Sequence, residues 1–384
     1  MSYSDVADHR NMVFDGVRNA AYTRALEKVV GPDTTVMDLG AGLGILGLMA
    51  ARLGAGKVYL VEPTVAIELA RQAAADNGLS AVECIRATAE QLKLNDNLDA
   101  KVDVIVSVFT GNFLLEEDLL PSLFYARDHH LAPGGQLIPD RGRMEVVPVS
   151  AADYYEKYIG SWGQFPEHCR KEGLPEIEYR AVRPYAANSM AYDTTENIQA
   201  QRLGAPAPLL ELDFNTAQKA ECDADIEVLI ESDGICHGWM GWFQIRLVNE
   251  WLSTDGEQNK THWSQVFLPL EQPLTVVTGD RLRLALKRPE GGQWSWSTTL
   301  GSKSQRQSSF LSQPLRPQDL LKQSDHYRPQ LHDKAQGLQW LLDHINGEAS
   351  VTQLASELRL AQPGMFASEA QALQFVRAVA ESLG

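Results

Sequence analysis

The spacing of hydrophobic positions changes twice along the chain. Up to residue 147, apolar runs with β-branched residues alternate with stretches in which apolar residues recur three or four positions apart, as in α/β folds. From 148 to 310 the runs are shorter and are bounded by turns such as Gly279-Asp280, which predicts antiparallel strands. A helical period returns after residue 334. The pattern predicts a parallel sheet, then an antiparallel β-barrel or sandwich, then a small helical module.

These changes divide the chain into consecutive segments. We expect N-terminal helices over residues 1–31, a sheet domain over 32–147, a β domain over 148–310, a Pro/Gln-rich linker over 311–334 and a helical module over 335–384. In the module, apolar residues from Leu338 to Ile345, a helix start at Ser350 and the capping pattern Ser368-x-x-Gln371 predict three short helices, in a winged-helix-like arrangement.

One βαβ unit carries the most specific pattern. An apolar strand from Val36 ends in Asp38-Leu39-Gly40-Ala41-Gly42-Leu43-Gly44, a helix follows, and the next apolar strand ends in Glu62. The glycines at 40, 42 and 44 permit a sharp turn and close approach of a ligand, and a carboxylate at the position of Glu62 can accept both hydroxyls of a ribose. Because the glycine spacing differs from that of dinucleotide sites, the unit predicts an S-adenosylmethionine (AdoMet) site of a class I methyltransferase.

Composition narrows the class of protein. Of 384 residues, 44% are apolar and 22% are charged, the ordinary values of a soluble globular enzyme. The net charge of −16 argues against a nucleic-acid partner, and no apolar run is long enough to span a membrane. The four cysteines form no C-x-x-C pair, and residues 1–5 lack the features of a secretion signal. We therefore expect a cytoplasmic protein with reduced thiols and no bound metal.

A second loop should face the cofactor. The apolar run Val102–Ser107 predicts another strand of the same sheet, and ligands of open α/β sheets bind beyond the carboxyl ends of the strands. The stretch Ile85–Glu90 is also expected as a strand. Within the N-terminal helices, Arg18 is a candidate partner for a ligand carboxylate, because a guanidinium binds carboxylate with two parallel hydrogen bonds.

Several separate motifs together resemble those of the protein arginine methyltransferases, of which this chain would be a divergent, bacterial-type member. They are His9-x-x-Met12, Asp15-x-x-Arg18, Asp38 to Gly44, Val61-Glu62, Ser107 to Glu117, Tyr125-Ala126-Arg127-Asp128, Leu131-x-Pro133-Gly134-Gly135, Pro139-Asp140-Arg141 and Thr261-His262-Trp263. The resemblance covers roughly residues 8–300. It implies a Rossmann-like AdoMet domain followed by a β-barrel, and a homodimer formed through an arm at about residues 155–195, whose sequence is aromatic and irregular in pattern.

The resemblance also implies roles for single residues. Arg18 would bind the methionine carboxylate, Glu62 the ribose and Glu90 the adenine amino group, and the product would be S-adenosylhomocysteine. The implied cofactor-binding set is His9, Met12, Arg18, Asp38, Gly40, Gly42, Gly44, Glu62 and Glu90. The implied catalytic set is Glu117, His262 and Asp15, with Asp15 and His262 paired beside the active site.

The Ser107 loop departs from the family pattern. Family members hold the substrate guanidinium with two glutamates of this loop, of which this chain keeps the second as Glu117 and has Val108 in place of the first. The expected substrate pocket consists of Val108, Phe109, Thr110, Asn112, Glu116 and Trp263. Because a buried guanidinium with one carboxylate keeps uncompensated charge, Glu116 or Asn112 would have to supply the second contact.

Three functions remain open from the sequence. The first is N-methylation of an arginine or arginine-like guanidine in a protein, in a peptide or free in solution. The second is methylation of an oxygen, sulfur or amine on a small metabolite or modified peptide, with Glu117 as general base. The third is a catalytically silent AdoMet-binding scaffold.

Overall fold

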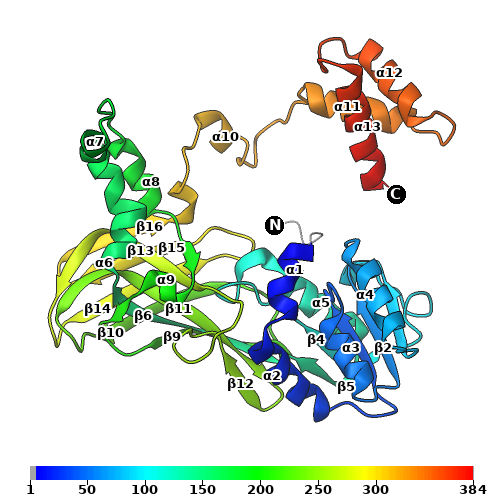
Figure 1. Ribbon diagram of the computed structural model, residues 1–384, viewed down its shortest axis with the longest axis horizontal. Coiled ribbons are helices and arrows are strands. Elements are labelled where there is room, and N and C mark those ends of the chain that lie inside the picture. The colour runs from blue at the N-terminus through cyan, green and yellow to red at the C-terminus, as the bar shows by residue number, and fades with distance from the viewer. Residues whose placement is uncertain (1–5, 384) are drawn as a thin grey trace. The chain divides into compact units, whose positions relative to one another are not determined.

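The computed structural model of the chain describes residues 6–383 (Figure 1). Residues 1–5, which were expected to lack a secretion signal, lie outside this range. Residue 384 of the expected helical module also lies outside it. The chain divides into two compact units, one that runs to Pro314 and one that begins at Leu315. No helix among the described residues is long and apolar enough to cross a membrane.

A five-stranded parallel sheet with flanking helices begins the first unit (Figure 1). Its strands, in the spatial order β3-β2-β1-β4-β5, are β1 (Thr35–Leu39), β2 (Lys57–Val61), β3 (Val82–Ile85), β4 (Val102–Ser107) and β5 (Leu131–Ile138). The helices are α1 (Val6–Val13), α2 (Gly16–Glu27), α3 (Ile45–Arg52), α4 (Ala66–Asp76) and α5 (Leu120–His130), with short 3₁₀ turns η1 (Ala89–Gln91) and η2 (Glu116–Asp118). This confirms the predicted α/β domain.

Strand register brings the expected site residues to one edge of the sheet. Leu39, the last residue of β1, lies opposite Val61 of β2 and Ser107 of β4. The glycine turn, Glu62 and the Ser107 loop therefore begin side by side at the carboxyl ends of three adjacent strands. The sheet order places this edge where ligands bind in open α/β folds.

Antiparallel strands follow, as predicted, and form two sheets. One has the order β10-β14-β15-β16, and the other has the order β7-β13-β11-β6-β8, with β12 added to β11 and β9 to β6. The strands are β6 (Arg141–Ser150), β7 (Ala191–Asp193), β8 (Gln201–Arg202), β9 (Ala207–Asp213), β10 (Cys222–Leu229), β11 (Gly234–Leu247), β12 (Glu250–Ser253), β13 (Gln265–Val276), β14 (Arg281–Arg288), β15 (Ser295–Leu300) and β16 (Lys303–Ser308). The sheets meet where β9 contacts β10 and β13 contacts β16.

One hydrophobic core is shared by the parallel sheet and the antiparallel sheets. It runs from residues such as Leu60 and Ile105 to Ile245 and Leu284 without interruption. Three tryptophans belong to this core, since Trp263, Trp294 and Trp296 are 6%, 3% and 1% exposed. The two parts of the first unit are therefore packed as one body.

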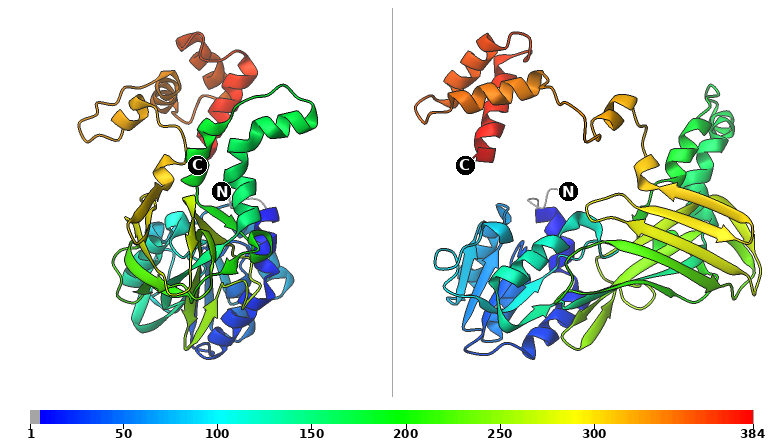
Figure 2. Two further views of the ribbon diagram at one scale, coloured as in Figure 1. Left: turned by 90° about the vertical axis from the view of Figure 1, so that its left-hand side faces the viewer. Right: turned by 180° about the vertical axis from the view of Figure 1, so that it is seen from behind.

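An arm rises from the antiparallel sheets between β6 and β7, and both views of Figure 2 show it standing away from them. The sequence between Tyr154 and Tyr185 was expected to be irregular, and this expectation is wrong. It folds into α6 (Ala152–Tyr155), the π-turn η3 (Glu156–Gly160), α7 (Ser161–Glu172), η4 (Arg180–Val182) and α8 (Arg183–Ala187), with α9 (Thr195–Ile198) after β7. Aromatic residues four positions apart explain the difference, because Tyr154 packs on Tyr158 and the Trp162 indole donates to the Tyr158 carbonyl.

The second unit contains the three predicted helices, α11 (Asp333–His344), α12 (Val351–Ala361) and α13 (Glu369–Leu383). Ser350 caps α12 through the Gln353 amide, as its sequence predicted. The helices enclose their own small core around Leu341, Leu358 and Val376. The turn η5 (Ser309–Leu311) ends where the expected linker begins, and the linker contains the helix α10 (Pro317–Leu321). No strand occurs among the described residues of this unit, and its likeness to a winged helix stays a prediction.

Candidate active site

The glycine turn after β1 has the backbone that its sequence requires. Gly40, Gly42 and Gly44 have φ of 70°, 53° and 81°, values that residues with a side chain rarely adopt. Asp38, at the end of β1, accepts a hydrogen bond of 2.7 Å from the Gly47 amide in the first turn of α3. Burial raises the pKa of Asp38 to about 7, although the Gly47 amide opposes this. Asp38 thereby ties the start of α3 to β1 and shapes the turn between them.

Glu62 lies across the turn from β1. Its carboxylate is 6% exposed and accepts hydrogen bonds from the Gly42 amide at 3.0 Å and the Thr64 amide at 2.9 Å. Each carboxylate oxygen has capacity for a further hydrogen bond. Glu62 can therefore accept ligand hydroxyls while it holds the turn.

Arg18 is a buried cation on α2. It is 1% exposed and donates to the Met12 carbonyl at 2.7 Å and to the Asn19 side chain at 2.8 Å. Among residues 6–383, no carboxylate lies within ion-pair distance of its guanidinium. Burial lowers the pKa of Arg18 because the charged form loses its hydration. An anionic ligand group beside Arg18 would supply the missing compensation.

Two rings lie against the glycine turn. His9 on α1 is buried, and a Cβ added to Gly42 would lie 2.8 Å from its imidazole. A Cβ on Gly40 would come within 2.1 Å of the Phe109 ring. Both glycines are therefore needed for these rings to approach the turn.

Glu90 is exposed and lies on the turn η1 rather than on the expected extension of β3. The capping box of Thr88 and Gln91 stabilises that turn. Burial would raise the pKa of Glu90, but hydrogen bonds from the Ser122 hydroxyl at 2.6 Å, from its own backbone and from Thr88 together outweigh burial, and the pKa is lowered. Glu90 is thus an ionised acceptor near the rim of the sheet.

The Ser107 loop is joined to the loop that carries Thr261-His262-Trp263. The Trp263 indole donates to the Thr110 carbonyl at 3.2 Å, and the Asn112 side-chain oxygen accepts from the Ser264 amide at 3.0 Å. The oxygen of Asn112, considered as a second contact for a guanidinium, is therefore already engaged.

The three expected catalytic side chains share one region. Asp15, which caps α2, accepts hydrogen bonds from both the backbone N–H and Nδ1 of His262. Burial lowers the pKa of His262, while Asp15 and the nearby charge of Glu117 oppose that change. Glu117 is exposed, Val108 is half-buried, and the region therefore has one accessible carboxylate close to a neutral imidazole.

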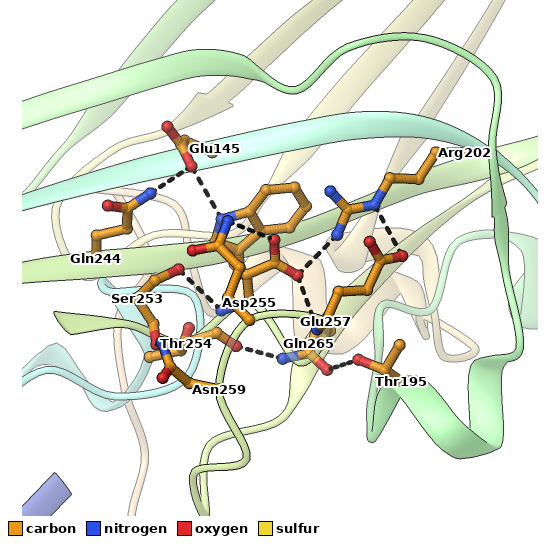
Figure 3. A network of polar contacts seen from close by, with 12 residues as sticks. Glu145, Thr195, Arg202, Gln244, Ser253, Thr254, Asp255, Glu257, Asn259 and Gln265 are labelled. Carbon is orange, nitrogen blue, oxygen red and sulfur yellow. Dashed lines mark hydrogen bonds and ion pairs between the residues drawn. The ribbon is translucent and has the colours of Figure 1, made fainter. Parts of the chain in front are cut away.

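A buried polar network fixes both ends of the segment that leads to His262 (Figure 3). Asp255, 1% exposed, forms an ion pair of 2.7 Å with Arg202. At the other end, the side-chain amide of Gln265 donates to the Thr254 carbonyl at 2.6 Å. The loop between these residues is anchored to the antiparallel sheets on both sides.

Two contacts of the site were not predicted from the sequence. The Tyr22 hydroxyl donates to the Ser107 carbonyl at 3.0 Å and so ties α2 to the end of β4. Tyr22 lies four residues after Arg18, on the same helix face, and that spacing was a usable signal. Glu116 points to the antiparallel sheets, where the Trp294 indole donates to its carboxylate at 2.6 Å. Glu116 and Trp294 are 178 residues apart in sequence, and only the folded chain brings them together.

Family models match both parts of the first unit. Residues 140–295 match the model described as the arginine methyltransferase oligomerization subdomain, and residues 21–139 match that of ribosomal protein L11 methyltransferase. Together the two models cover the glycine turn, Glu62, the Ser107 loop and His262.

Curated relatives match over most of their length. Protein arginine N-methyltransferase 1 of Schizosaccharomyces pombe is 30% identical over 301 residues, which are 76% of this chain and 84% of the relative. Protein arginine N-methyltransferase 6 of Xenopus laevis is 29% identical over 295 residues, which are 72% of this chain and 84% of the relative.

Solved structures agree. The Trypanosoma brucei PRMT1 enzyme-prozyme heterotetrameric complex with AdoHcy is 25% identical, with a TM-score of 0.70, over 80% of this chain and 99% of that one. Protein arginine methyltransferase 10 of Arabidopsis thaliana, in an open conformation, has a TM-score of 0.66 at 25% identity over the same shares of the two chains.

Proposed function

Because the chain belongs to the protein arginine N-methyltransferase family, we propose that it methylates a guanidine nitrogen of arginine or of an arginine-like acceptor. The enzyme class and the cofactor follow from the family. The protein is an AdoMet-dependent methyltransferase, and S-adenosylhomocysteine is its second product. The acceptor, the residue roles and the assembly are the proposed parts.

The residues around the glycine turn fit the cofactor. Arg18, a buried guanidinium with no carboxylate in ion-pair reach among the described residues, would take the methionine carboxylate. Glu62 would accept the ribose hydroxyls, and Glu90 would accept the adenine amino group. His9 and Met12 on α1 would close over the turn. When bound, the cofactor supplies an electrophilic methyl group on a sulfonium.

Glu117 would hold the acceptor. One carboxylate can accept two N–H groups of a guanidinium and so orient a nitrogen lone pair toward the methyl group. The observation that carries the proposal is that Glu117 lies close enough to His262 to affect its pKa, so the carboxylate and the Asp15–His262 pair border one region beside the cofactor turn. The acidic chain, with a net charge of −16, also favours a cationic acceptor.

A second function is favoured by Val108. This half-buried valine stands where the family has a carboxylate. Asn112 and Glu116 are less suited to replace it, because Asn112 Oδ1 already accepts from the Ser264 amide and Glu116 Oε1 accepts from the Trp294 indole. With one carboxylate, the site also suits an oxygen, sulfur or amine nucleophile of a small metabolite or modified peptide. Glu117 would then remove the proton. A silent AdoMet-binding scaffold is the third candidate, and the retained Glu117 and His262 oppose it.

We also propose a homodimer formed through the arm. Its surface exposes Tyr158, Leu174, Ile177 and Tyr179, which are 41–53% exposed. Val65 and Leu69, which precede and lie on α4, are 52% and 48% exposed and offer a second apolar surface. Apolar patches of this kind mark protein interfaces. The four free cysteines suit a cytoplasmic location.

The deciding experiment is an acceptor screen with the full chain. Free arginine, arginine-containing peptides and matched acceptors without a guanidine are incubated with AdoMet, and S-adenosylhomocysteine release and product mass are measured. We expect the mass of guanidine acceptors to rise by that of one added methyl group in place of a hydrogen. The Glu117→Gln variant, which cannot accept two N–H groups in the same way, is the control and should lose this activity. Turnover only of acceptors without a guanidine would replace the proposal with the second function.

A further inference from the structure

The backbone of Glu117 is in an unfavourable conformation. Glu117 and Asp118 have φ of 73° and 54°, in the left-handed region that residues other than glycine seldom occupy. Such backbone strain persists only where surrounding contacts hold it. The question is therefore which contacts keep this turn in place.

Both neighbours of Glu117 are held by the antiparallel sheets. On one side, Glu116 accepts a hydrogen bond of 2.6 Å from the Trp294 indole. On the other side, Asp118 forms an ion pair of 2.7 Å with Arg288 at the end of β14. Trp294 and Arg288 are 3% and 4% exposed, so their positions are set by the core rather than by solvent.

The two holding residues also support each other. The Arg288 guanidinium lies 5.5 Å from the centroid of the Trp294 ring, in a cation–π arrangement. Trp294 packs in turn on Phe113, at 5.3 Å between ring centroids, within the same loop as Glu117. Among the described residues, Asp118 provides the only ion pair of Arg288. Removing a partner from a buried charge is strongly unfavourable, so this contact should be persistent.

We propose that Arg288 and Trp294 are positioning residues for Glu117: they hold Glu116 and Asp118 against the antiparallel sheets, and the carboxylate between them is thereby turned toward the acceptor. This inference rests on the proposed role of Glu117. It assigns a function to Glu116 as an anchor, which leaves Glu117 as the single acidic contact from this turn. The influence of the Glu117 charge on His262 agrees with that direction.

The test compares variants that release one anchor at a time. Arg288→Met removes the ion pair with Asp118, and Arg288→Lys restores a positive charge. Trp294→Phe removes the indole N–H and keeps an aromatic ring against Phe113. Arg283→Met is the matched control, because Arg283 also lies on β14 and forms an ion pair, with Asp225, on the exposed side of the strand.

The first readout is the titration of His262 by NMR in protein without acceptor, with the signal assigned from its loss in His262→Asn. Glu117 raises the pKa of His262, so Glu117→Gln gives the full fall expected when that carboxylate is removed. We expect Arg288→Met to give at least half of that fall. Loss of the Arg288 charge alone would raise the pKa, so a fall reports movement of Glu117. The Arg283→Met control should leave the titration unchanged.

The second readout is catalysis. We expect kcat for the best acceptor to fall about tenfold or more in Arg288→Met and in Trp294→Phe, with unchanged AdoMet affinity and with partial recovery in Arg288→Lys. An unchanged His262 titration in both Arg288→Met and Trp294→Phe would overturn the inference. The titration needs no turnover, so a fall in the pKa of His262 supports the positioning role even if the acceptor screen finds no guanidine methylation.

Discussion

Asp15 and His262 are 247 residues apart in sequence, yet one oxygen of Asp15 accepts both the backbone N–H and the imidazole Nδ1 of His262 at 2.8 Å. The other oxygen accepts the Arg18 amide at 2.8 Å and caps α2. A single carboxylate thus fixes the helix that carries the proposed cofactor arginine and the loop that borders the proposed acceptor site. The proposed cofactor and acceptor positions would be coupled through it.

Glu62→Ala should weaken AdoMet binding by about 1.5–3 kcal/mol, the usual value of hydrogen bonds to a charged group. Calorimetric titration measures the change. Because Glu62 also accepts the Gly42 amide, circular dichroism should accompany it to show an intact fold. Glu68→Ala, which removes an exposed carboxylate on α4, is the control. Equal affinity in wild type and Glu62→Ala would remove Glu62 from the cofactor site.

Asp38 should make the cofactor-free protein less stable as the pH rises from about 4 to about 7. The native state holds its proton up to a pKa of about 7, whereas the unfolded chain releases it near 3.8. Unfolding in this window releases a proton, so the free energy of unfolding falls by on the order of 1 kcal/mol per pH unit. Asp38→Asn lacks this titration and can still accept the Gly47 amide.

Denaturant unfolding at several pH values provides the measurement. The difference between Asp38→Asn and wild type should shift in favour of the variant up to about pH 7 and then level off. Asp96→Asn, at an exposed position of the same sheet domain, is the control. A difference that does not vary with pH would mean that Asp38 is ionised throughout the range.

Val108→Glu should increase kcat/KM for arginine acceptors by about 10- to 100-fold, because a second carboxylate would compensate the guanidinium. Val108→Gln is the control of similar size without the charge. A variant that folds and binds AdoMet but gains no guanidine activity would show that another residue sets the acceptor class.

Leu174→Glu combined with Ile177→Glu should convert the proposed dimer into a monomer, since both side chains are about half exposed on the arm. Buried charge without a partner would oppose association. Light scattering at micromolar concentration measures the mass. Leu229→Glu introduces one such charge at an equally exposed position of β10 and should leave the dimer intact. A monomeric wild type would contradict the proposal directly.

Sequence patterns predicted the order of the two sheet types and the three C-terminal helices, because their period and caps are local. They also predicted that Gly40, Glu62 and Ser107 meet, since the rule for parallel strands places their carboxyl ends at one edge. The helical arm was not predicted because Gly160, Gly163 and Pro166 interrupt its pattern, and glycine and proline disfavour helices. The contact of Asp118 with Arg288 joins residues 170 apart, and no local pattern marks such a pair.

The continuous core beneath the parallel and antiparallel sheets bears on how the chain melts. Residues on both sides of the junction, such as Ile105 and Ile245, belong to one buried cluster, so loss of either part would expose the surface of the other. These parts should unfold in a single cooperative transition, whereas the C-terminal helices, with a separate core around Leu341, should melt independently. Differential scanning calorimetry should therefore record two heat-absorption peaks, and AdoMet should shift only the larger one upward.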